Sequence, residues 1–327
     1  MGLFGFIRRL FSSPASAEAA TASTLGMNDL ARRLGLEADQ LQAIVSAYRT
    51  FTVPKRSGGT RSIDAPLDDF KLFQRRLLKR VLARLPVHSA ATAFQPGLSI
   101  VHHAMRHTLR QVVLRMDIRD FFPSITADRV RQYFQALGWR GQALKLLTSW
   151  TTHQDRLPQG APTSPKLANA LCYHMDTRIS KAITETYTFN PKTLETIKSQ
   201  AAHVAYSRYA DDLTFSFDID SHDQVNRTIY MVKQIVEEEG FRIHTRKKLR
   251  IMRPHDRQFV TGLVVNAGVN LPRSRRRQLR AVEHHLATGK SATMTRAQLA
   301  GWRALEQMVL VQSSTLPEDE IRDSSSV

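Results

Sequence analysis

Two adjacent aspartates, Asp211 and Asp212, lie between two runs of strand-forming residues in the stretch YSRYADDLTFSF. Apolar or aromatic residues recur at every second position on both sides, at Val204, Tyr206, Leu213, Phe215 and Phe217. This period of two predicts a two-strand ribbon with one buried face and with the acids at its tip. Two carboxylates about 4 Å apart repel by roughly 4 kcal/mol at an effective dielectric near 20, so the pair indicates that a cation lies beside it.

An isolated Asp-Asp pair is more often a solvated turn than a site, so a metal site requires a third oxygen ligand from elsewhere in the chain. The stretch QVVLRMDIRDFF supplies one in Asp117, 94 residues before Asp211. One face of this predicted strand carries four apolar side chains, Val112, Leu114, Met116 and Ile118. Asp117 lies on the other face, near the end of the strand. Three carboxylates around two Mg²⁺ ions about 3.5 to 4 Å apart are what a polymerase needs.

The overall charge favours a polyanionic partner. Lys and Arg number 47 against 29 Asp and Glu, which gives a formal net charge of +18 in 327 residues. Nucleic acid is the first candidate, and a membrane surface is the alternative, although no long amphipathic basic helix is evident. The single cysteine, Cys172, excludes an internal disulfide and fits a reducing cytosol.

The N-terminus does not have the pattern of an export signal. The stretch MGLFGFIRRLF is apolar for about ten residues but is interrupted by Arg8 and Arg9, whereas a signal peptide has its charges first and a spanning helix needs about 20 residues. We therefore expect no export and no membrane span. An amphipathic helix that docks on the protein or on a membrane surface remains an alternative.

The rest of the chain mixes helices and short strands without strict alternation, which predicts an α+β fold with a sheet backed by helices. Two short helices are expected on either side of Leu34-Gly35, and their outline fits either simple packing or a helix-turn-helix. A hairpin is expected in FTVPKRSGGTRSIDAP. Further predicted elements are helices within 126–150, 162–182 and 222–239 and a strand at Phe241–His244.

Three motifs, MDIRDFF, LPQGAPTSP and YADD, occur in that order and resemble the palm motifs of reverse transcriptases. The resemblance extends over roughly residues 27–312. It implies that Asp117, Asp211 and Asp212 are the catalytic, metal-binding acids and that the carbonyl of Ile118 is an additional ligand. It also implies two Mg²⁺ ions as cofactors, with Mn²⁺ as an alternative.

The same resemblance assigns nucleotide-binding residues. Phe122 matches the aromatic side chain that excludes a 2′-hydroxyl, so deoxynucleotides are expected as substrates. Gln159 and Gly160 match the segment that lines the nucleotide and template pocket. Arg61 resembles the basic residue of the finger hairpin that grips the triphosphate. Lys247 matches a lysine that acts as general acid on pyrophosphate or as a countercharge.

Several features resemble the retron branch of this family. QGAPTSP has the form QGxPxSP, and Val260-Thr261-Gly262 resembles the VTG signature. The run from His103 to His107 resembles the element NAxxH, but with His where Asn is usual. Because His103 and His107 are four residues apart, they also fit a metal-binding helix face, but no HExxH glutamate is present, which favours packing or RNA contact.

The segment LPRSRRRQLRAVEHHLATGK is a predicted RNA-binding region. Five arginines lie near the start of its helix, Arg273, Arg275, Arg276, Arg277 and Arg280. Cations are unfavourable at a helix N-terminus unless phosphate is nearby. We interpret the segment as part of a thumb that contacts an RNA stem or the template–primer duplex.

The resemblance implies a right-hand polymerase with an antiparallel palm sheet backed by helices. The expected division is a flexible leader (1–26), N-terminal helices and fingers (27–110), a palm (111–265, with finger elements at about 126–165), a thumb (266–315) and a disordered tail (316–327).

As implied by the retron resemblance, this cytoplasmic bacterial enzyme, a nucleotidyltransferase, would be an RNA-directed DNA polymerase. It would use a structured noncoding RNA of the msr-msd type as template and primer, make a branched RNA–DNA product (msDNA) from dNTPs, and work with an effector protein in antiphage defence. The alternatives are a group II intron-like or CRISPR-associated reverse transcriptase, a noncatalytic RNA-binding scaffold, and a nucleotide cyclase built on a related palm.

Overall fold

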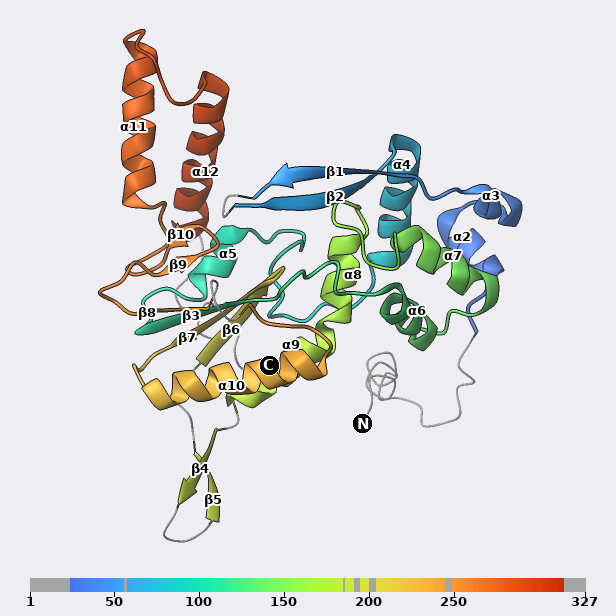
Figure 1. Ribbon diagram of the computed structural model, residues 1–327, viewed down its shortest axis with the longest axis horizontal. Coiled ribbons are helices and arrows are strands. Elements are labelled where there is room, and N and C mark those ends of the chain that lie inside the picture. The colour runs from blue at the N-terminus through green and yellow to red at the C-terminus, as the bar shows by residue number, and fades with distance from the viewer. Residues whose placement is uncertain are drawn as a thin grey trace. The chain divides into compact units, whose positions relative to one another are not determined.

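The structure is a computed structural model that describes residues 24–55, 58–184, 186–190, 195–199, 204–244 and 249–314 (Figure 1). The chain divides into two compact units. Unit 1 comprises Met1–His88, Arg119–Thr177 and Glu239–Phe241, and unit 2 comprises Ser89–Ile118, Arg178–Glu238 and Arg242–Val327. The expected leader and tail fall almost entirely outside the described residues.

Unit 1 consists mainly of helices with one β-ribbon. Its elements are α2 (Met27–Leu34), α3 (Ala38–Ala43), β1 (Tyr48–Pro54), β2 (Thr60–Pro66), α4 (Asp68–Leu77), the π-helical turn η1 (Leu78–Leu82), α6 (Ala127–Ala136), α7 (Gly141–Thr151), α8 (Ser164–Leu171) and the start of α9 (Tyr173–Thr184). The predicted break between the first two helices is confirmed. Gly35 ends α2 with a left-handed φ of 63° and donates its N–H to Ala31, as C-terminal glycines do.

The predicted hairpin of unit 1 is the antiparallel ribbon β1–β2, in register from Tyr48↔Pro66 to Pro54↔Thr60. The end of the ribbon away from its turn contacts the loop that contains Gln159 and Gly160, since the Asp64 N–H donates to the Gln159 carbonyl at 2.9 Å. A Cβ on Gly160, whose φ is 132°, would lie 2.9 Å from the Asp64 carbonyl oxygen. The close approach of the two backbones therefore requires glycine at position 160.

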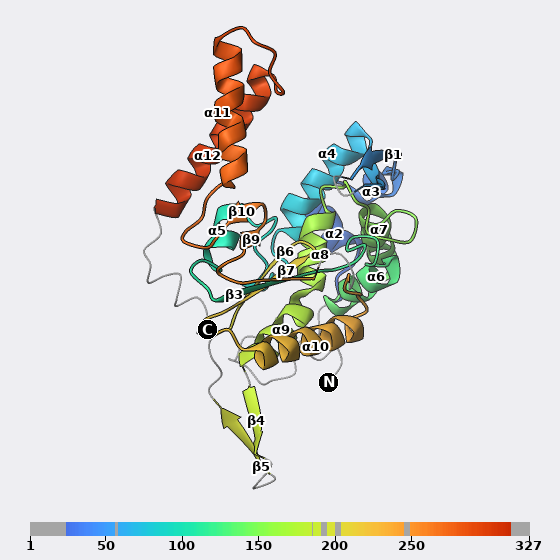
Figure 2. The same cartoon turned by 60° about the vertical axis from the view of Figure 1, so that its left-hand side comes forward.

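Unit 2 is built on a four-stranded antiparallel sheet with the order β6-β7-β3-β8. Its elements are α5 (Ile100–Met105), β3 (Val112–Asp117), most of α9, β4 (Thr186–Asn190), β5 (Glu195–Ser199), β6 (Val204–Tyr209), β7 (Asp212–Phe217), α10 (His222–Glu238), β8 (Arg250–Met252), β9 (Phe259–Val260), β10 (Leu263–Val264), α11 (Arg273–Ala287) and α12 (Arg296–Ser314). In both ribbon views α10 runs along one face of the sheet (Figures 1 and 2). The predicted antiparallel sheet backed by a helix is therefore confirmed.

The last two helices, α11 and α12, lie side by side as a hairpin (Figures 1 and 2). Leu279 of α11 and Val309 of α12 are buried in a core that also contains Val101 and Met105 of α5. Ser99, at the start of α5, donates a hydrogen bond to Gln312 at 2.5 Å. Apolar burial and this hydrogen bond fix the base of the hairpin on α5.

Two predicted elements differ in the structure. The expected strand at Phe241–His244 is reduced to an isolated bridge between Ile118 and Ile243. The strand that pairs with β3 there is β8, whereas Phe241 is buried against Phe121 and lies under the Arg129 guanidinium at 4.4 Å. The helix expected over 162–182 is divided into α8 and α9 at Cys172.

None of the helices in the described ranges combines the length and the apolar character that a bilayer crossing requires.

Candidate active site

The two adjacent acids lie where β6 turns into β7. Tyr209 pairs with Asp212, so only Ala210 and Asp211 form the loop. Ala210 has a φ of 57°, whereas Asp211 does not have a positive φ, and these signs are those of a type II′ hairpin turn. That position normally favours glycine, so the turn is strained and has to be held by its surroundings.

The third acid lies directly across the sheet. Asp117, the last residue of β3, is the register partner of Asp212, and opposite residues in a sheet point to the same face. The Ile118 N–H donates to the Asp211 carbonyl at 2.9 Å, and the His244 N–H donates to the Asp117 carbonyl at 2.8 Å. Backbone pairing thus brings all three predicted catalytic acids to one end of β3 and β7.

The side chain of Asp212 already has a positive partner. Arg115, two residues before Asp117, donates from Nη2 to Asp212 Oδ1 at 2.8 Å, while its Nε is buried with no hydrogen-bond partner. Within the described parts of the chain, no three His, Cys, Asp or Glu side chains form a group that could hold a metal ion. Carboxylate and carbonyl oxygens are the donors that Mg²⁺ prefers, so these residues fit the ion in chemistry and backbone position, whereas the Asp212 side chain is turned to Arg115.

Four of the predicted nucleotide-binding residues, Arg61, Phe122, Gln159 and Gly160, belong to unit 1, whereas Lys247, the acids and Ile118 belong to unit 2. Arg61 is exposed on β2 opposite Val53. Phe122 packs edge-on against Phe121, with ring centroids 5.3 Å apart. Gln159 and Gly160 lie against β2 through the backbone contacts with Asp64 described above. Lys247 lies outside the described residues.

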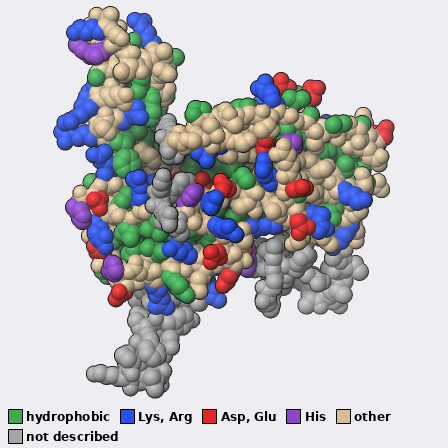
Figure 3. Space-filling view, in the orientation of Figure 1, with side chains coloured by type: hydrophobic (Ala, Val, Ile, Leu, Met, Phe, Trp, Pro, Cys, Tyr) green, Lys and Arg blue, Asp and Glu red, His purple; other side chains and the backbone are tan. Residues whose placement is uncertain are grey.

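The five arginines of the predicted RNA-binding region begin α11. Four of them are exposed, namely Arg273, Arg276, Arg277 and Arg280. Arg275 differs, because its guanidinium lies 4.2 Å from the ring centroid of Trp302 on α12. Lys and Arg side chains gather along the α11 side of this helical hairpin (Figure 3).

His103 and His107 are fully buried. The predicted packing role is therefore confirmed for both, and the alternative of RNA contact is wrong. His103 Nδ1 lies 2.8 Å from Thr92 Oγ1 and 2.9 Å from Ser207 Oγ. His107 Nε2 lies 2.7 Å from the same Ser207 hydroxyl, and its Nδ1 lies 2.8 Å from Ser216 Oγ. These ring nitrogens are all within hydrogen-bonding distance of hydroxyl groups, which suits neutral imidazoles.

Sequence reasoning did not identify Arg115 or the partners of these histidines. Arg115 lies two residues from Asp117 on a strand, so alternation places both side chains on the same face. That spacing was the available signal for Arg115. No sequence pattern pairs His103 with Ser207, since the two are 104 residues apart.

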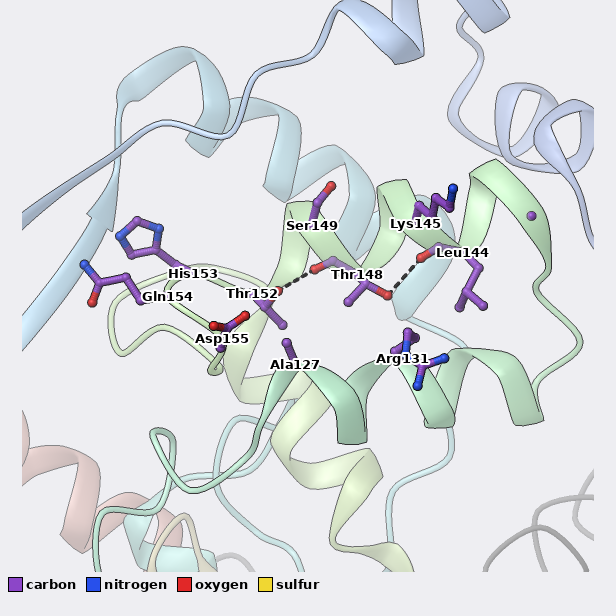
Figure 4. Close-up of a pocket in the computed structure, with 11 residues that line it drawn as sticks. Ala127, Arg131, Leu144, Lys145, Thr148, Ser149, Thr152, His153, Gln154 and Asp155 are labelled. Atoms are coloured by element: carbon purple, nitrogen blue, oxygen red, sulfur yellow. Dashed lines mark hydrogen bonds between the residues drawn. The ribbon is translucent and has the colours of Figure 1, made fainter.

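A surface pocket of about 680 Å³ lies between α6, α7 and the loop after α7, all in unit 1 (Figure 4). Arg131 and Lys145 contribute its cations, and Asp155 contributes a carboxylate. The hydroxyls of Thr148 and Thr152 are used within α7, because each donates to the carbonyl four residues earlier at 2.8 Å. This pocket contains none of the predicted site residues.

Comparison with known proteins identifies the family of this chain. The sequence model of one family, described as "Reverse transcriptase (RNA-dependent DNA polymerase)", matches residues 53–270. The chain is 36% identical over 324 residues to the retron Mx162 reverse transcriptase of Myxococcus xanthus, covering 86% of this chain and 63% of that protein.

Two further relatives are of the same kind. The chain is 37% identical over 283 residues to the retron Mx65 reverse transcriptase of Myxococcus xanthus, covering 81% of this chain and 62% of that protein. It is 31% identical over 283 residues to the retron Ec86 reverse transcriptase of Escherichia coli, covering 84% of this chain and 82% of that protein. It thus spans less than two thirds of the two Myxococcus relatives.

The chain belongs to the reverse transcriptase family, and within that family to the bacterial retron type.

The buried histidines predict how stability depends on pH. Desolvation by burial, with the nearby charges of Arg106 and Arg115, lowers the pKa of His103 from 6.5 to about 3. Because the pKa of His103 is lower in the folded state than in the unfolded state, its contribution to the free energy of unfolding is fully present above about pH 6.5. This contribution is lost as the pH falls toward 3. One such group contributes a slope of about 1.4 kcal/mol per pH unit.

Denaturant unfolding between pH 7.5 and pH 5 tests this dependence. We expect the free energy of unfolding to fall less steeply below pH 6.5 in His103→Asn than in the wild type, because the variant has no titrating ring at position 103. Parallel curves for the two proteins would contradict a neutral, buried His103.

Proposed function

We propose that this protein is an RNA-directed DNA polymerase of the retron type. The observation that carries the proposal is the register pair Asp117↔Asp212, with Asp211 in the adjoining two-residue turn. A noncatalytic scaffold would have no need for a repulsive set of acids at a strained turn. The similarity to retron reverse transcriptases supports the same activity.

The acids would hold two Mg²⁺ ions through the carboxylates of Asp117, Asp211 and Asp212 and the carbonyl of Ile118, with Mn²⁺ as an alternative. When bound, such ions activate an attacking hydroxyl and stabilise a leaving pyrophosphate. In the absence of metal, the Arg115 guanidinium neutralises Asp212. We propose that metal binding replaces this ion pair. This exchange keeps the repulsion between neighbouring carboxylates offset in both states.

Residues of unit 1 would select the substrate. Arg61, exposed on the β1–β2 ribbon, would bind the triphosphate, and Phe122 would exclude ribonucleotides by contact with the 2′ position. Gln159 and Gly160 would line the nucleotide pocket, since their backbone is fixed against β2 by the hydrogen bond from Asp64. Lys247 would protonate or neutralise the leaving pyrophosphate.

We assign the right-hand domains on the same basis. The fingers would comprise residues 27–110 with elements of about 126–165, the palm 111–265 and the thumb 266–315. The α11–α12 hairpin would form most of the thumb and contact RNA through the exposed arginines of α11. The partner would be a structured noncoding RNA of the msr-msd type, primed from a 2′-hydroxyl to give a branched RNA–DNA hybrid in the bacterial cytoplasm.

An effector protein and a role in antiphage defence complete the proposal, on the retron family resemblance alone. A group II intron-like or CRISPR-associated enzyme would differ in one measurable respect, namely independence from a single cognate RNA. Sequencing the nucleic acid that copurifies with the protein would identify that RNA.

Primer extension tests the catalytic assignment. The double variant Asp211→Asn, Asp212→Asn removes two negative ligands with little change in shape. Loss of several kcal/mol of transition-state stabilisation corresponds to a decrease on the order of 10³-fold in rate. The double variant Asp218→Asn, Asp220→Asn is the control, because it removes the same charge beyond the other end of β7. Equal extension by the wild type and the Asp211/Asp212 variant, or no extension by the wild type on its copurifying RNA, would refute the assignment.

RNA binding as a function of salt tests the role of α11. Replacing Arg276, Arg277 and Arg280 with Gln should lower the slope of log affinity against log salt by about 2 to 3, because each phosphate contact releases counterions. Arg275→Gln is the matched control, because Arg275 packs on Trp302. It should lower the thermal unfolding midpoint and change the slope by less than about 1. An unchanged slope in the triple variant would place the RNA elsewhere.

A further inference from the structure

His103 and the hydroxyls of Thr92, Ser207 and Thr214 form a buried network next to the turn that carries Asp211. Ser207 of β6 and Thr214 of β7 are register partners, and they lie two pairs from the turn. His103 of α5 contacts both, at 2.9 Å from Nδ1 to Ser207 Oγ and at 3.4 Å from Nε2 to Thr214 Oγ1. One imidazole therefore joins the two strands of the hairpin to a helix outside the sheet.

The same network supports the outer strand of the hairpin. β6 is at the edge of the sheet, and among the described residues Ala91 forms an isolated bridge with Arg208, whose N–H donates to the Ala90 carbonyl at 2.7 Å. Thr92 extends this contact, because its N–H donates to the Arg208 carbonyl at 2.9 Å and its hydroxyl lies 2.8 Å from His103 Nδ1. His103 thus connects α5, the segment that contains Thr92, and both strands of the hairpin.

Two further contacts hold the turn itself. Arg208 is fully buried, and its Nη1 donates to the carbonyl of Ala210 at 3.1 Å. The His103 ring lies 5.5 Å from the ring of Tyr209, measured between centroids. Because Ala210 has an unfavourable φ, contacts that fix the residues before it determine whether the strained turn persists.

An apolar side chain in place of His103 would remove one hydrogen-bond partner from each of three buried hydroxyls, leaving Thr92 with the Arg208 carbonyl and Ser207 with His107. Thr92, Ser207 and Thr214 are all almost fully buried, and an unsatisfied buried polar group is costly, whereas a fully satisfied network favours one arrangement. The hydrogen-bonding pattern therefore selects an orientation of the hairpin, a task that simple hydrophobic packing performs less specifically.

We propose that His103 is a positioning residue: through Thr92, Ser207 and Thr214 it fixes the Tyr209–Asp212 turn against the end of β3. This inference rests on the proposed function, in which Asp211 and Asp212 are metal ligands. His103 does not touch substrate and acts only through the hairpin. Its place in the NAxxH-like element is explained in this way, because Asn also supplies one donor and one acceptor group.

Amide hydrogen exchange of the metal-free protein tests the proposal without reference to activity. The reporters are the amide of Ile118, which donates to Asp211, and the peptide 205–214. We expect His103→Leu to raise their exchange rates roughly tenfold or more relative to the rest of the sheet, and His103→Asn to lie between Leu and the wild type. Val232→Ala on α10, a buried change in the same unit, should leave this ratio unchanged.

Single-nucleotide extension under stabilising conditions gives the functional readout. A misplaced hairpin should lower kcat roughly 10- to 100-fold and raise the Mg²⁺ concentration for half-maximal rate in His103→Leu but not in Val232→Ala. If His103→Leu does not fold, Ser207→Ala, which removes the hydroxyl between the two rings, carries the same test.

Exchange and kcat in the folded variant equal to those of the wild type, or matched by Val232→Ala, would overturn the positioning role. A wild type that extends no primer on its own RNA would instead refute the proposed function, while the exchange result would still report on the hairpin.

Discussion

The antiparallel pairing of β3 with β7 is the interaction on which the candidate active site depends. It places Asp117 opposite Asp212 and brings Asp211 to the same end through a two-residue turn. A slip of one residue would turn one of the opposed carboxylates to the other face of the sheet. The apolar residues of β3 and β7 prevent that slip, because their burial specifies one register.

The repulsion among the three carboxylates is offset by a neighbouring side chain. Arg115 on β3 pairs with Asp212, and partly buried pairs of this kind keep more of their Coulomb energy than exposed ones. The strained turn is held by Arg208 and by the hydroxyl contacts of His103. The site is thus pre-organised by hydrogen bonds to the hairpin and by the Arg115 cation, which suits a metal-dependent polymerase.

Much of this could be predicted from the sequence, for physical reasons that apply to particular residues. The alternation around Asp211 and Asp117 predicted three strands and the ends at which the acids lie, and Gly35 predicted a helix end. β8 was missed because its three residues are too few to show a period. Phe241 was wrongly predicted to lie in a strand, because its packing against Phe121 is a tertiary contact that no local pattern shows. The partners of His103 and the engagement of Arg275 by Trp302 likewise depend on contacts that no local pattern contains.

Anomalous diffraction from crystals grown with Mn²⁺ would show directly whether the three acids bind metal. We predict an anomalous peak within metal–ligand distance of carboxylate oxygens from Asp117 and from at least one of Asp211 and Asp212, with Arg115 moved away from Asp212. Mn²⁺ bound only elsewhere, with the Arg115–Asp212 pair intact at saturating metal, would contradict it.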